Sequence, residues 1–303
     1  MPQIPNLFII GAPKTGSTAL AEILNLHPEI YVDPRKEPRY FDQHIIFDDP
    51  KYYPIKNIKD YLKVYKKKES IKSKYSVDAS VHNMYSELSI KNILNLNPAS
   101  KFILILRDPI DAAKSMHLQQ LKYLDEAHRE VSEDFDEVWS LLRLREKGYE
   151  YPNGCKTKFL FRYDLLYSYQ LYLPFIRKNI KKENLLIINY ATFKTNYKKV
   201  FSSILNFLNV SKIDLPSLKK NPSGISEFSK KNILIFNTRK FLQKVSKKLN
   251  LSNTYLTNKI ASSKLLSYEL TKKNIKVSKL DSEIKYYFKD SYKAIEEIKD
   301  IMI

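Results

Sequence analysis

Short apolar runs alternate with longer segments of helical spacing over the first two-thirds of the chain. The clearest run, FILIL at 102–106, is rich in branched side chains and typical of a strand buried on both faces of a sheet. We predict strands at 7–10, 29–32, 75–78, 102–106 and 185–188. Apolar residues three or four positions apart predict helices at 19–24, 58–65, 84–94, 110–121, 135–144, 165–176 and 199–208. Such alternation predicts an α/β fold of three layers, with a central, mostly parallel, doubly wound sheet between helices.

The last quarter of the chain differs in charge and pattern. Apolar spacing predicts a basic amphipathic helix at 230–249 and a final helix at about 284–301. From Ser211 onward the chain has 20 Lys and Arg against 9 Asp and Glu, more than half of the net charge of +19. We therefore predict an α/β core over 1–228 and a basic helical extension over 229–303 that packs on the same domain.

Composition narrows the class of protein. A basic chain favours anionic partners such as nucleotides, acidic glycans, nucleic acids or membrane surfaces, although Lys, Asn and Ile are abundant throughout. The single cysteine, Cys155, excludes an intramolecular disulfide and a cysteine metal cluster, and it fits a reducing compartment. The sequence has no run of 18 apolar residues, and the first strand begins near residue 7. We expect a cytoplasmic protein without a signal peptide or membrane anchor.

The first strand leads into a loop suited to phosphate. The sequence LFIIGAPKTGSTAL places Pro13, Lys14, Thr15, Gly16, Ser17 and Thr18 between a buried strand and a helix. Unpaired N–H groups and the helix dipole would face one anion there. A nucleoside triphosphatase loop reads G-x-x-x-x-G-K-[ST], but this chain has Ser17 where that lysine stands. Lys14 therefore fits the 5′-phosphate of a smaller nucleotide. The alternative is a simple glycine turn with a solvated lysine.

Two further loops follow predicted strands. Lys36-Glu37-Pro38-Arg39-Tyr40-Phe41 comes after the second strand, at the sheet edge where open α/β sheets place ligand groups. Arg107 ends the strand at 102–106, and Ser115 lies eight residues later on the next helix. A guanidinium fork and a hydroxyl suit phosphate. Alternatively, Glu37 pairs with Lys36 or Arg39, and Arg107 with Asp108 or Asp111.

Together these segments resemble the sulfotransferases that use 3′-phosphoadenosine 5′-phosphosulfate (PAPS), most closely the heparan sulfate and bacterial carbohydrate branch. Residues 13–18 resemble the 5′-phosphosulfate loop P-K-x-G-[ST]-T. The segment LILRDPIDAAKS at 104–115 resembles the 3′-phosphate site, and KEPRYF resembles K-E-P-x-[FY]-F. Weaker similarities lie at 78–80, 167–171 and 221–224. Asp78 replaces the usual glutamate of its motif.

The resemblance implies a P-loop-like fold, a PAPS donor that leaves as adenosine 3′,5′-bisphosphate, and no metal requirement. It implies Lys14 and Glu37 as catalytic residues, with Glu37 as general base. The implied donor site comprises Pro13, Lys14, Thr15, Gly16, Ser17, Thr18, Ala19, Arg107, Ser115, Ser223 and Gly224. On the acceptor side we place Lys36, Arg39, Ser80 and His82, of which His82 is the alternative base.

The predicted function is sulfuryl transfer to a hydroxyl or amine, with a glycan as the favoured acceptor. Lipids, peptides and small metabolites stay open as acceptors. Two other functions stay open: a small-molecule kinase, which would need ATP and Mg²⁺, and a basic nucleic-acid or membrane binder with a degenerate nucleotide site. We expect no nucleic-acid partner. Peripheral contact of the basic tail with an anionic surface stays open, as does the oligomeric state.

Overall fold

A five-stranded parallel sheet forms the centre of the computed structural model, which describes residues 4–66, 70, 72–123, 125–213, 226–227, 271–272 and 280–303. The strand order is β2-β3-β1-β4-β5, and every neighbouring pair in this sheet is parallel. The strands are β1 (Leu7–Gly11), β2 (Ile30–Val32), β3 (Tyr75–Asp78), β4 (Lys101–Leu106) and β5 (Leu185–Asn189). All five predicted strands are confirmed, as is the parallel α/β architecture.

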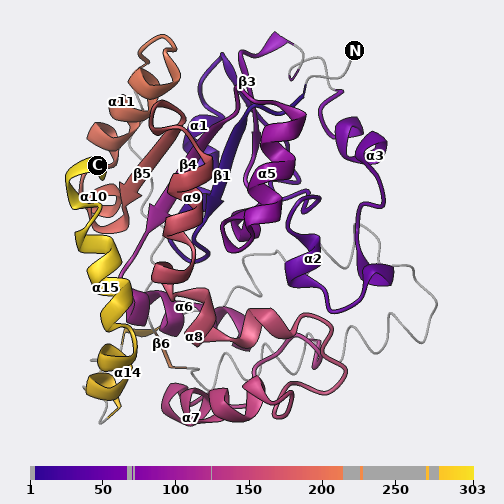
Figure 1. The fold of residues 1–303 in the computed structure, drawn as a ribbon, viewed down its shortest axis with the longest axis vertical. Coiled ribbons are helices and arrows are strands. Elements are labelled where there is room, and N and C mark those ends of the chain that lie inside the picture. Colours follow the sequence, from indigo (N-terminus) through magenta and orange to yellow (C-terminus); the bar gives the residue numbers. More distant parts are fainter. Residues whose placement is uncertain are drawn as a thin grey trace.

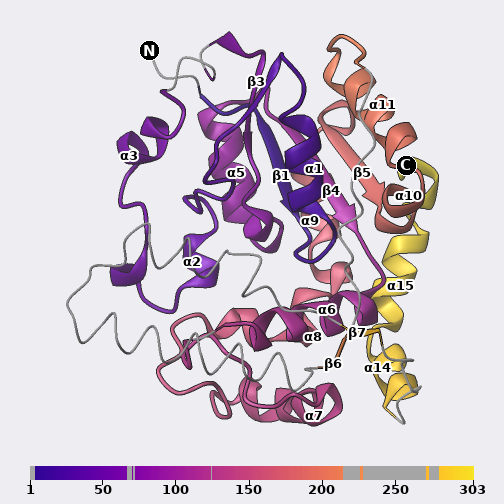
Figure 2. The ribbon, with the colours of Figure 1, turned by 180° about the vertical axis from the view of Figure 1, so that it is seen from behind.

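The central strands are apolar because both of their faces are covered. Along β1, Phe8 and Ile10 enter one core, and Leu7 and Ile9 enter the other. Helices α1 (Ser17–Leu24), α10 (Tyr190–Thr195) and α11 (Tyr197–Leu208) cover one face. The opposite face carries α5 (Glu87–Leu96) and α9 (Leu173–Asn179), so the sheet lies between two helical layers (Figures 1 and 2).

The remaining helices lie around this unit. In Figure 1, α6 (Pro109–Leu121), α7 (Phe135–Glu146) and α8 (Tyr163–Leu166) lie below the sheet, and α2 (Gln43–Ile46) and α3 (Ile58–Lys63) lie to one side. Short 3₁₀ turns lie between these elements: η1 (Pro50–Tyr52), η2 (Val81–Tyr85), η3 (Lys158–Phe161), η4 (Tyr169–Leu171) and η5 (Lys182–Asn184). Two short strands, β6 (Ser226–Glu227) and β7 (Thr271–Lys272), pair antiparallel.

The helices predicted at 165–176 and 84–94 have different bounds in the structure. The helix predicted at 165–176 is broken into α8, η4 and α9. Pro174 lies in the first turn of α9, where it lacks the N–H that would continue an earlier helix. The helix predicted at 84–94 begins later, at Glu87, because the Ser86 side chain caps it by accepting a hydrogen bond from the Ser89 N–H.

The C-terminal residues pack on the core. The helix predicted at 284–301 is split into α14 (Asp281–Tyr287), α15 (Lys289–Glu296) and η7 (Lys299–Ile301). At the break, Phe288 is fully buried, with its ring 5.5 Å from that of Trp139. Ile303 exchanges hydrogen bonds with β5, donating to the Ile187 carbonyl at 3.0 Å. The helix predicted at 230–249 lies outside the described residues, and the domain boundary at 228 stays a prediction.

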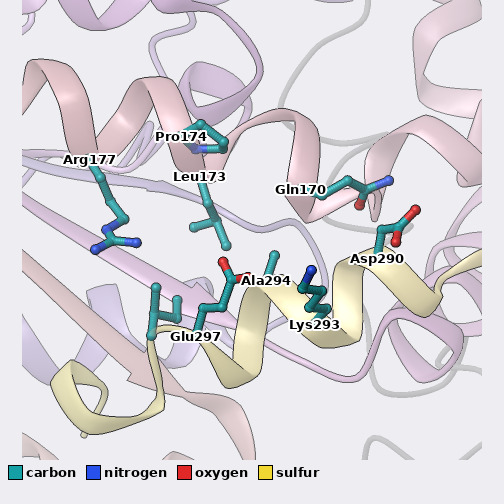
Figure 3. A pocket seen from close by; sticks show the side chains of 9 residues that line it. Gln170, Leu173, Pro174, Arg177, Asp290, Lys293, Ala294 and Glu297 are labelled. Carbon is teal, nitrogen blue, oxygen red and sulfur yellow. The ribbon is translucent and has the colours of Figure 1, made fainter.

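A groove of about 520 Å³ lies where α15 meets η4 and α9. Figure 3 shows that side chains of both signs line it, with Arg177 on one wall and Glu297 on the other. None of its lining residues belongs to the loops that follow the strands. The groove is therefore separate from the site predicted from the sequence.

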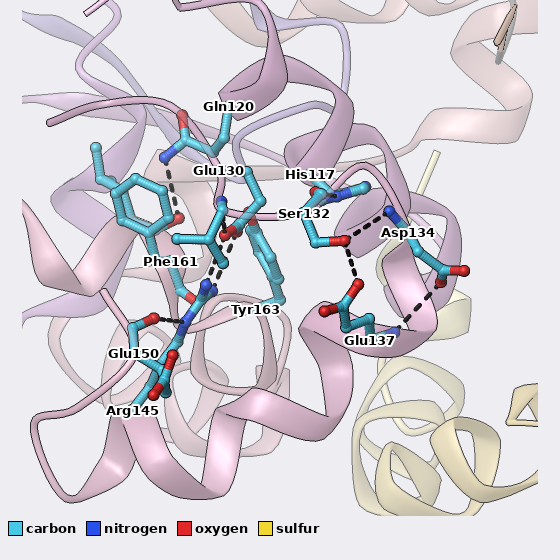
Figure 4. A network of polar contacts seen from close by, with 12 residues as sticks. His117, Gln120, Glu130, Ser132, Asp134, Glu137, Arg145, Glu150, Phe161 and Tyr163 are labelled. Atoms are coloured by element: carbon cyan, nitrogen blue, oxygen red, sulfur yellow. Dashed lines mark hydrogen bonds and ion pairs between the residues drawn. The ribbon is translucent and has the colours of Figure 1, made fainter. Parts of the chain in front are cut away.

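A buried ion pair holds α7 against the loops that flank it (Figure 4). Arg145 and Glu130 have fully buried side chains and are joined by hydrogen bonds of 2.6 and 3.1 Å. Arg145 also donates to the carbonyls of Phe161 and Glu150, and Tyr163 donates to Glu130 at 2.6 Å. This satisfied network ties residues 130–163 together.

Replacing Arg145 with alanine is expected to lower the free energy of unfolding by about 3–5 kcal/mol, because Glu130 would stay buried without a cation. Urea denaturation measures the loss. Arg143→Ala, on the exposed side of α7, is the matched control and should change stability by less than about 0.5 kcal/mol. A loss below about 1 kcal/mol for Arg145→Ala would contradict the expectation that Glu130 is left buried as an uncompensated charge.

Candidate active site

The residues predicted to act together follow the carboxyl ends of the strands. Residues 12–16 come after β1, 33–42 after β2, 79–80 after β3 and Arg107 after β4. Because all five strands are parallel, their carboxyl ends share one edge of the sheet. The topology therefore gathers the predicted loops at one place.

The loop after β1 has the backbone of an anion cradle. Lys14 and Gly16 adopt left-handed conformations, with φ of 64° and 87°. Thr15 Oγ1 donates to the Ala12 carbonyl at 2.6 Å, and Tyr167 donates to the Pro13 carbonyl at 3.3 Å. Helix α1 then begins without a side-chain cap at Gly16. Its first N–H groups, from Ser17, Thr18 and Ala19, are thus available to an anion.

Two glycines, Gly11 at the end of β1 and Gly16 at the start of α1, are required by their surroundings. A Cβ on Gly11 would collide with the Met84 side chain. At Gly16 the positive φ disfavours any other residue, and a Cβ would lie 3.2 Å from the Phe193 ring. Bulky neighbours therefore fix the path of the loop between β1 and α1.

Lys14 stands among other cations at this cradle. Its Nζ donates to Gln119 Oε1 at 3.2 Å. Burial, reinforced by the positive charges of Lys122, Arg107 and Lys36, lowers the pKa of Lys14 to about 8. Four cations surround one loop, and among the described residues no carboxylate pairs with Lys14. This arrangement favours a bound anion.

Affinity of the site for a nucleotide phosphate is expected to fall by up to tenfold per pH unit above about pH 8. A bound phosphate stabilises charged Lys14 and raises its pKa, so binding takes up a proton between the two pKa values and weakens as pH rises. Calorimetric titration of adenosine 3′,5′-bisphosphate between about pH 7 and 9.5 measures this, since its phosphates are ionised throughout. Lys14→Arg, which stays charged, should flatten the profile. A flat wild-type profile would contradict the placement of Lys14 at the anion.

Arg107 joins the cradle to the end of β4. Its Nη1 donates to the Lys14 carbonyl at 3.0 Å, and its guanidinium lies 4.7 Å from the Tyr190 ring centroid. Its Nε is buried and has no hydrogen-bond partner among the described residues. The alternative ion pair with Asp111 is present only at 3.9 Å, with an exposed carboxylate. The Nε–H of Arg107 is thus available to a ligand. Ser115, its predicted partner in phosphate binding, lies in the second turn of α6.

Glu37 is bracketed by two cations. Lys36 Nζ lies 2.8 Å from Glu37 Oε1, and Arg39 Nη2 lies 3.2 Å from Oε2. Burial alone would raise the pKa of Glu37, but the charges of Lys36 and Arg39 hold it below its usual range. Both ion pairs considered from the sequence are therefore present. Lys36 also contacts Ser17 and Thr18, so it lies on the donor loop as well as beside the acceptor candidates.

The loop carrying Glu37 rests on the segment after β3. The Ala79 N–H donates to the Lys36 carbonyl at 3.1 Å, and the Arg39 N–H donates to Ser80 Oγ at 3.0 Å. Lys36 and Arg39 both have φ of 57°, a conformation that costs energy in residues other than glycine. Ser80 therefore positions the Glu37 loop and is itself fully buried.

Beside this loop lies a buried polar cluster. Among the described residues, the side-chain oxygens of Asp42, both ring nitrogens of His82 and both amide atoms of Asn83 are buried without hydrogen-bond partners. His82 Nδ1 lies 3.8 Å from Asp42 Oδ2. Burial first, then Arg39, lowers the pKa of His82 to about 3, and burial raises that of Asp42 to about 8. His82 is therefore neutral near pH 7 and buried, whereas Glu37 is one-fifth exposed.

Most of the predicted site residues lie in or next to the loops at the carboxyl-end edge of the sheet. Ser223 and Gly224 lie outside the described residues. Sequence reasoning missed Gln119, Lys122, Tyr190, Asp42 and Asn83. Gln119 and Lys122 follow Ser115 at helical spacing of four and seven, a signal that would have identified this face of α6. Tyr190 and Asn83 gave no such signal.

A cradle of N–H groups and cations next to a one-fifth-exposed carboxylate can bind a nucleotide phosphate and accept a proton beside it. The fold is that of an α/β protein whose candidate site, an anion cradle beside a carboxylate, lies at the carboxyl ends of its parallel strands. A family model described as "Sulfotransferase domain" matches residues 5–263. The chain belongs to this family.

The names of individual relatives are consistent with this family assignment. The chain is 32% identical over 125 residues to a mouse (Mus musculus) bifunctional heparan sulfate N-deacetylase/N-sulfotransferase 4, covering 41% of this chain and 14% of that protein. It is 32% identical over 120 residues to mouse heparan sulfate glucosamine 3-O-sulfotransferase 5, and this match covers 40% of this chain and 32% of that protein. The chain thus spans a minor part of these relatives. A sulfotransferase structure from Alicyclobacillus acidocaldarius superposes with a TM-score of 0.59 at 22% identity, over 84% of this chain and 96% of that one, which confirms the fold.

Proposed function

We propose that this chain transfers the sulfuryl group of PAPS to a hydroxyl or amine of an acceptor. The observation that carries the proposal is the bond from Arg107 to the Lys14 carbonyl, which couples a strand-end arginine with free donors to the anion cradle. Arg107 and Ser115 would bind the 3′-phosphate. Lys14 and the first N–H groups of α1 would bind the 5′-phosphosulfate.

The site residues divide the chemistry between them. Glu37 would accept the proton of the acceptor group as that group bonds to sulfur. The bond from sulfur to the bridging oxygen breaks, and its electron pair stays on the 5′-phosphate. Lys14 and the α1 N–H groups would stabilise the charge that develops on that oxygen. The step needs no base other than Glu37, and the buried, neutral His82 is the less accessible candidate.

Calorimetry separates this function from a kinase. Adenosine 3′,5′-bisphosphate is expected to bind in the presence of EDTA, and ATP with Mg²⁺ is expected to bind much more weakly. Tight Mg²⁺-dependent ATP binding without bisphosphate binding would favour the kinase. Steeply salt-dependent binding of DNA or anionic vesicles, unaffected by the bisphosphate, would favour the basic binding protein.

For the acceptor we propose a carbohydrate, in keeping with relatives whose names specify heparan sulfate. The site supports this through a partly exposed cation beside Glu37, since Arg39 is 30% exposed at its side chain. A panel of neutral, amino and acidic oligosaccharides, each offered with labelled PAPS, tests the class. Labelling of a lipid or peptide fraction instead would exclude a carbohydrate acceptor.

The proposed location is the cytoplasm. Among the described helices, none is long and apolar enough to span a membrane.

A further inference from the structure

Lys36 stands between the two halves of the site. Its Nζ lies 2.8 Å from Glu37 Oε1, 3.1 Å from Thr18 Oγ1 and 3.4 Å from Ser17 Oγ. Thr18 and Ser17 begin α1, at the anion cradle, whereas Glu37 is the carboxylate offered to the acceptor. One ammonium group therefore touches both the donor cradle and the base.

The backbone holds Lys36 in this position. Its left-handed φ of 57° and the hydrogen bond from the Ala79 N–H to its carbonyl fix the Cα beside β3. The side chain is only 19% exposed. The Nζ already contacts the cradle hydroxyls. A rotation about the last bonds of the Lys36 side chain is therefore enough to move the ammonium group from Glu37 to an anion in the cradle.

The charges around Glu37 make such a move consequential. Arg39 on the same loop and His82 on η2 also face Glu37, and Asp42 and Asp78 lie near enough to interact with it. A carboxylate stabilised by two cations is a weak base. When Lys36 turns to an anion, Glu37 keeps one cation partner, Arg39, in a mostly buried place that disfavours its charged form.

We propose that Lys36 senses the donor: it pairs with Glu37 in the empty site and moves to the 5′-phosphosulfate when the donor binds, which frees Glu37 to take the acceptor's proton. This rests on the proposed function. The device couples base strength to occupation of the cradle, so that Glu37 becomes an effective base only when the 5′-anion of the nucleotide is bound there. By reciprocity, protonation of Glu37 and donor binding favour each other.

The test follows the Glu37 carboxyl by ¹³C NMR in protein labelled at glutamate side chains, with the resonance assigned by its loss in Glu37→Gln. In the wild type, adenosine 3′,5′-bisphosphate should raise the pKa of Glu37 by at least about one unit. In Lys36→Met the pKa should already be high and should move little on binding. Lys36→Arg should restore the wild-type shift, and Lys63→Met, at an exposed lysine on α3, is the matched control.

Each outcome is decisive. An equal shift in the wild type and in Lys36→Met would show that the nucleotide's own charge acts on Glu37 and would overturn the role of Lys36. Absence of a shift in the wild type would overturn it as well. The bisphosphate should bind Lys36→Met about tenfold more weakly, through loss of one charged hydrogen bond. If the bisphosphate does not bind the wild type at all, the proposed function fails, a result distinct from binding without a shift.

Discussion

Arg107→Ala is expected to weaken binding of adenosine 3′,5′-bisphosphate by about 30- to 5,000-fold. Removing one partner from a buried charged pair costs about 2–5 kcal/mol, and the Arg107 side chain is only 16% exposed. Its Nε has no partner among the described residues, so the 3′-phosphate would gain a donor that nothing else in that part of the chain uses. Calorimetric titration of the purified variant measures the loss.

The same titration with adenosine 5′-phosphate separates recognition from support of the loop. Arg107 also bonds the Lys14 carbonyl, so its removal could disturb the cradle. If Arg107 binds the 3′-phosphate, the variant should bind the monophosphate within about threefold of the wild type. Equal losses for both nucleotides would show that Arg107 only shapes the loop.

Glu37→Gln is expected to lower kcat by about 10²- to 10⁴-fold, the usual contribution of a general base. The amide keeps the shape of the side chain but cannot take a proton. Binding of adenosine 3′,5′-bisphosphate should persist, because Lys14, Arg107 and α1 are unchanged. Initial rates of bisphosphate release in the presence of acceptor measure the effect.

Glu87→Gln is the control for this substitution, since Glu87 pairs with Lys91 on the surface of α5. It should leave kcat unchanged. A rate for Glu37→Gln within threefold of the wild type would remove Glu37 as the base. The neutral imidazole of His82 would then be the next group to substitute.

The features of this fold that depend on local sequence pattern could be predicted from the sequence. The buried runs at 7–10 and 102–106 predict central strands because both of their faces need apolar cover. The run from Pro13 to Thr18 between a buried strand and a helix predicts the cradle, and the structure gives Lys14 and Gly16 of that run the left-handed conformations of such a turn. Arg107 was identified because it directly follows a strand.

Other features depend on contacts between distant segments. The helix predicted at 165–176 is broken where Tyr167 donates a hydrogen bond to the Pro13 carbonyl. At the same place Ser291, on α15, accepts a hydrogen bond from the Tyr169 N–H and donates one to the Tyr167 carbonyl. The position of Lys36 on the cradle hydroxyls depends on how the loop after β2 rests on Ala79. Periodicity along one segment contains no information about such partners. The proximity of Asp42 and Asn83 to His82 was missed for the same reason.

If the cradle and Glu37 together transfer a sulfuryl group, the acceptor must gain as much label as the donor loses. Incubation of the full chain with ³⁵S-labelled PAPS and a carbohydrate fraction, followed by measurement of acceptor-bound label and of adenosine 3′,5′-bisphosphate, tests this. We expect equal molar amounts of the two products, both lost in Glu37→Gln and in Arg107→Ala. Label that stays in the donor, or that appears only as free sulfate at the same rate in Glu37→Gln, would contradict it.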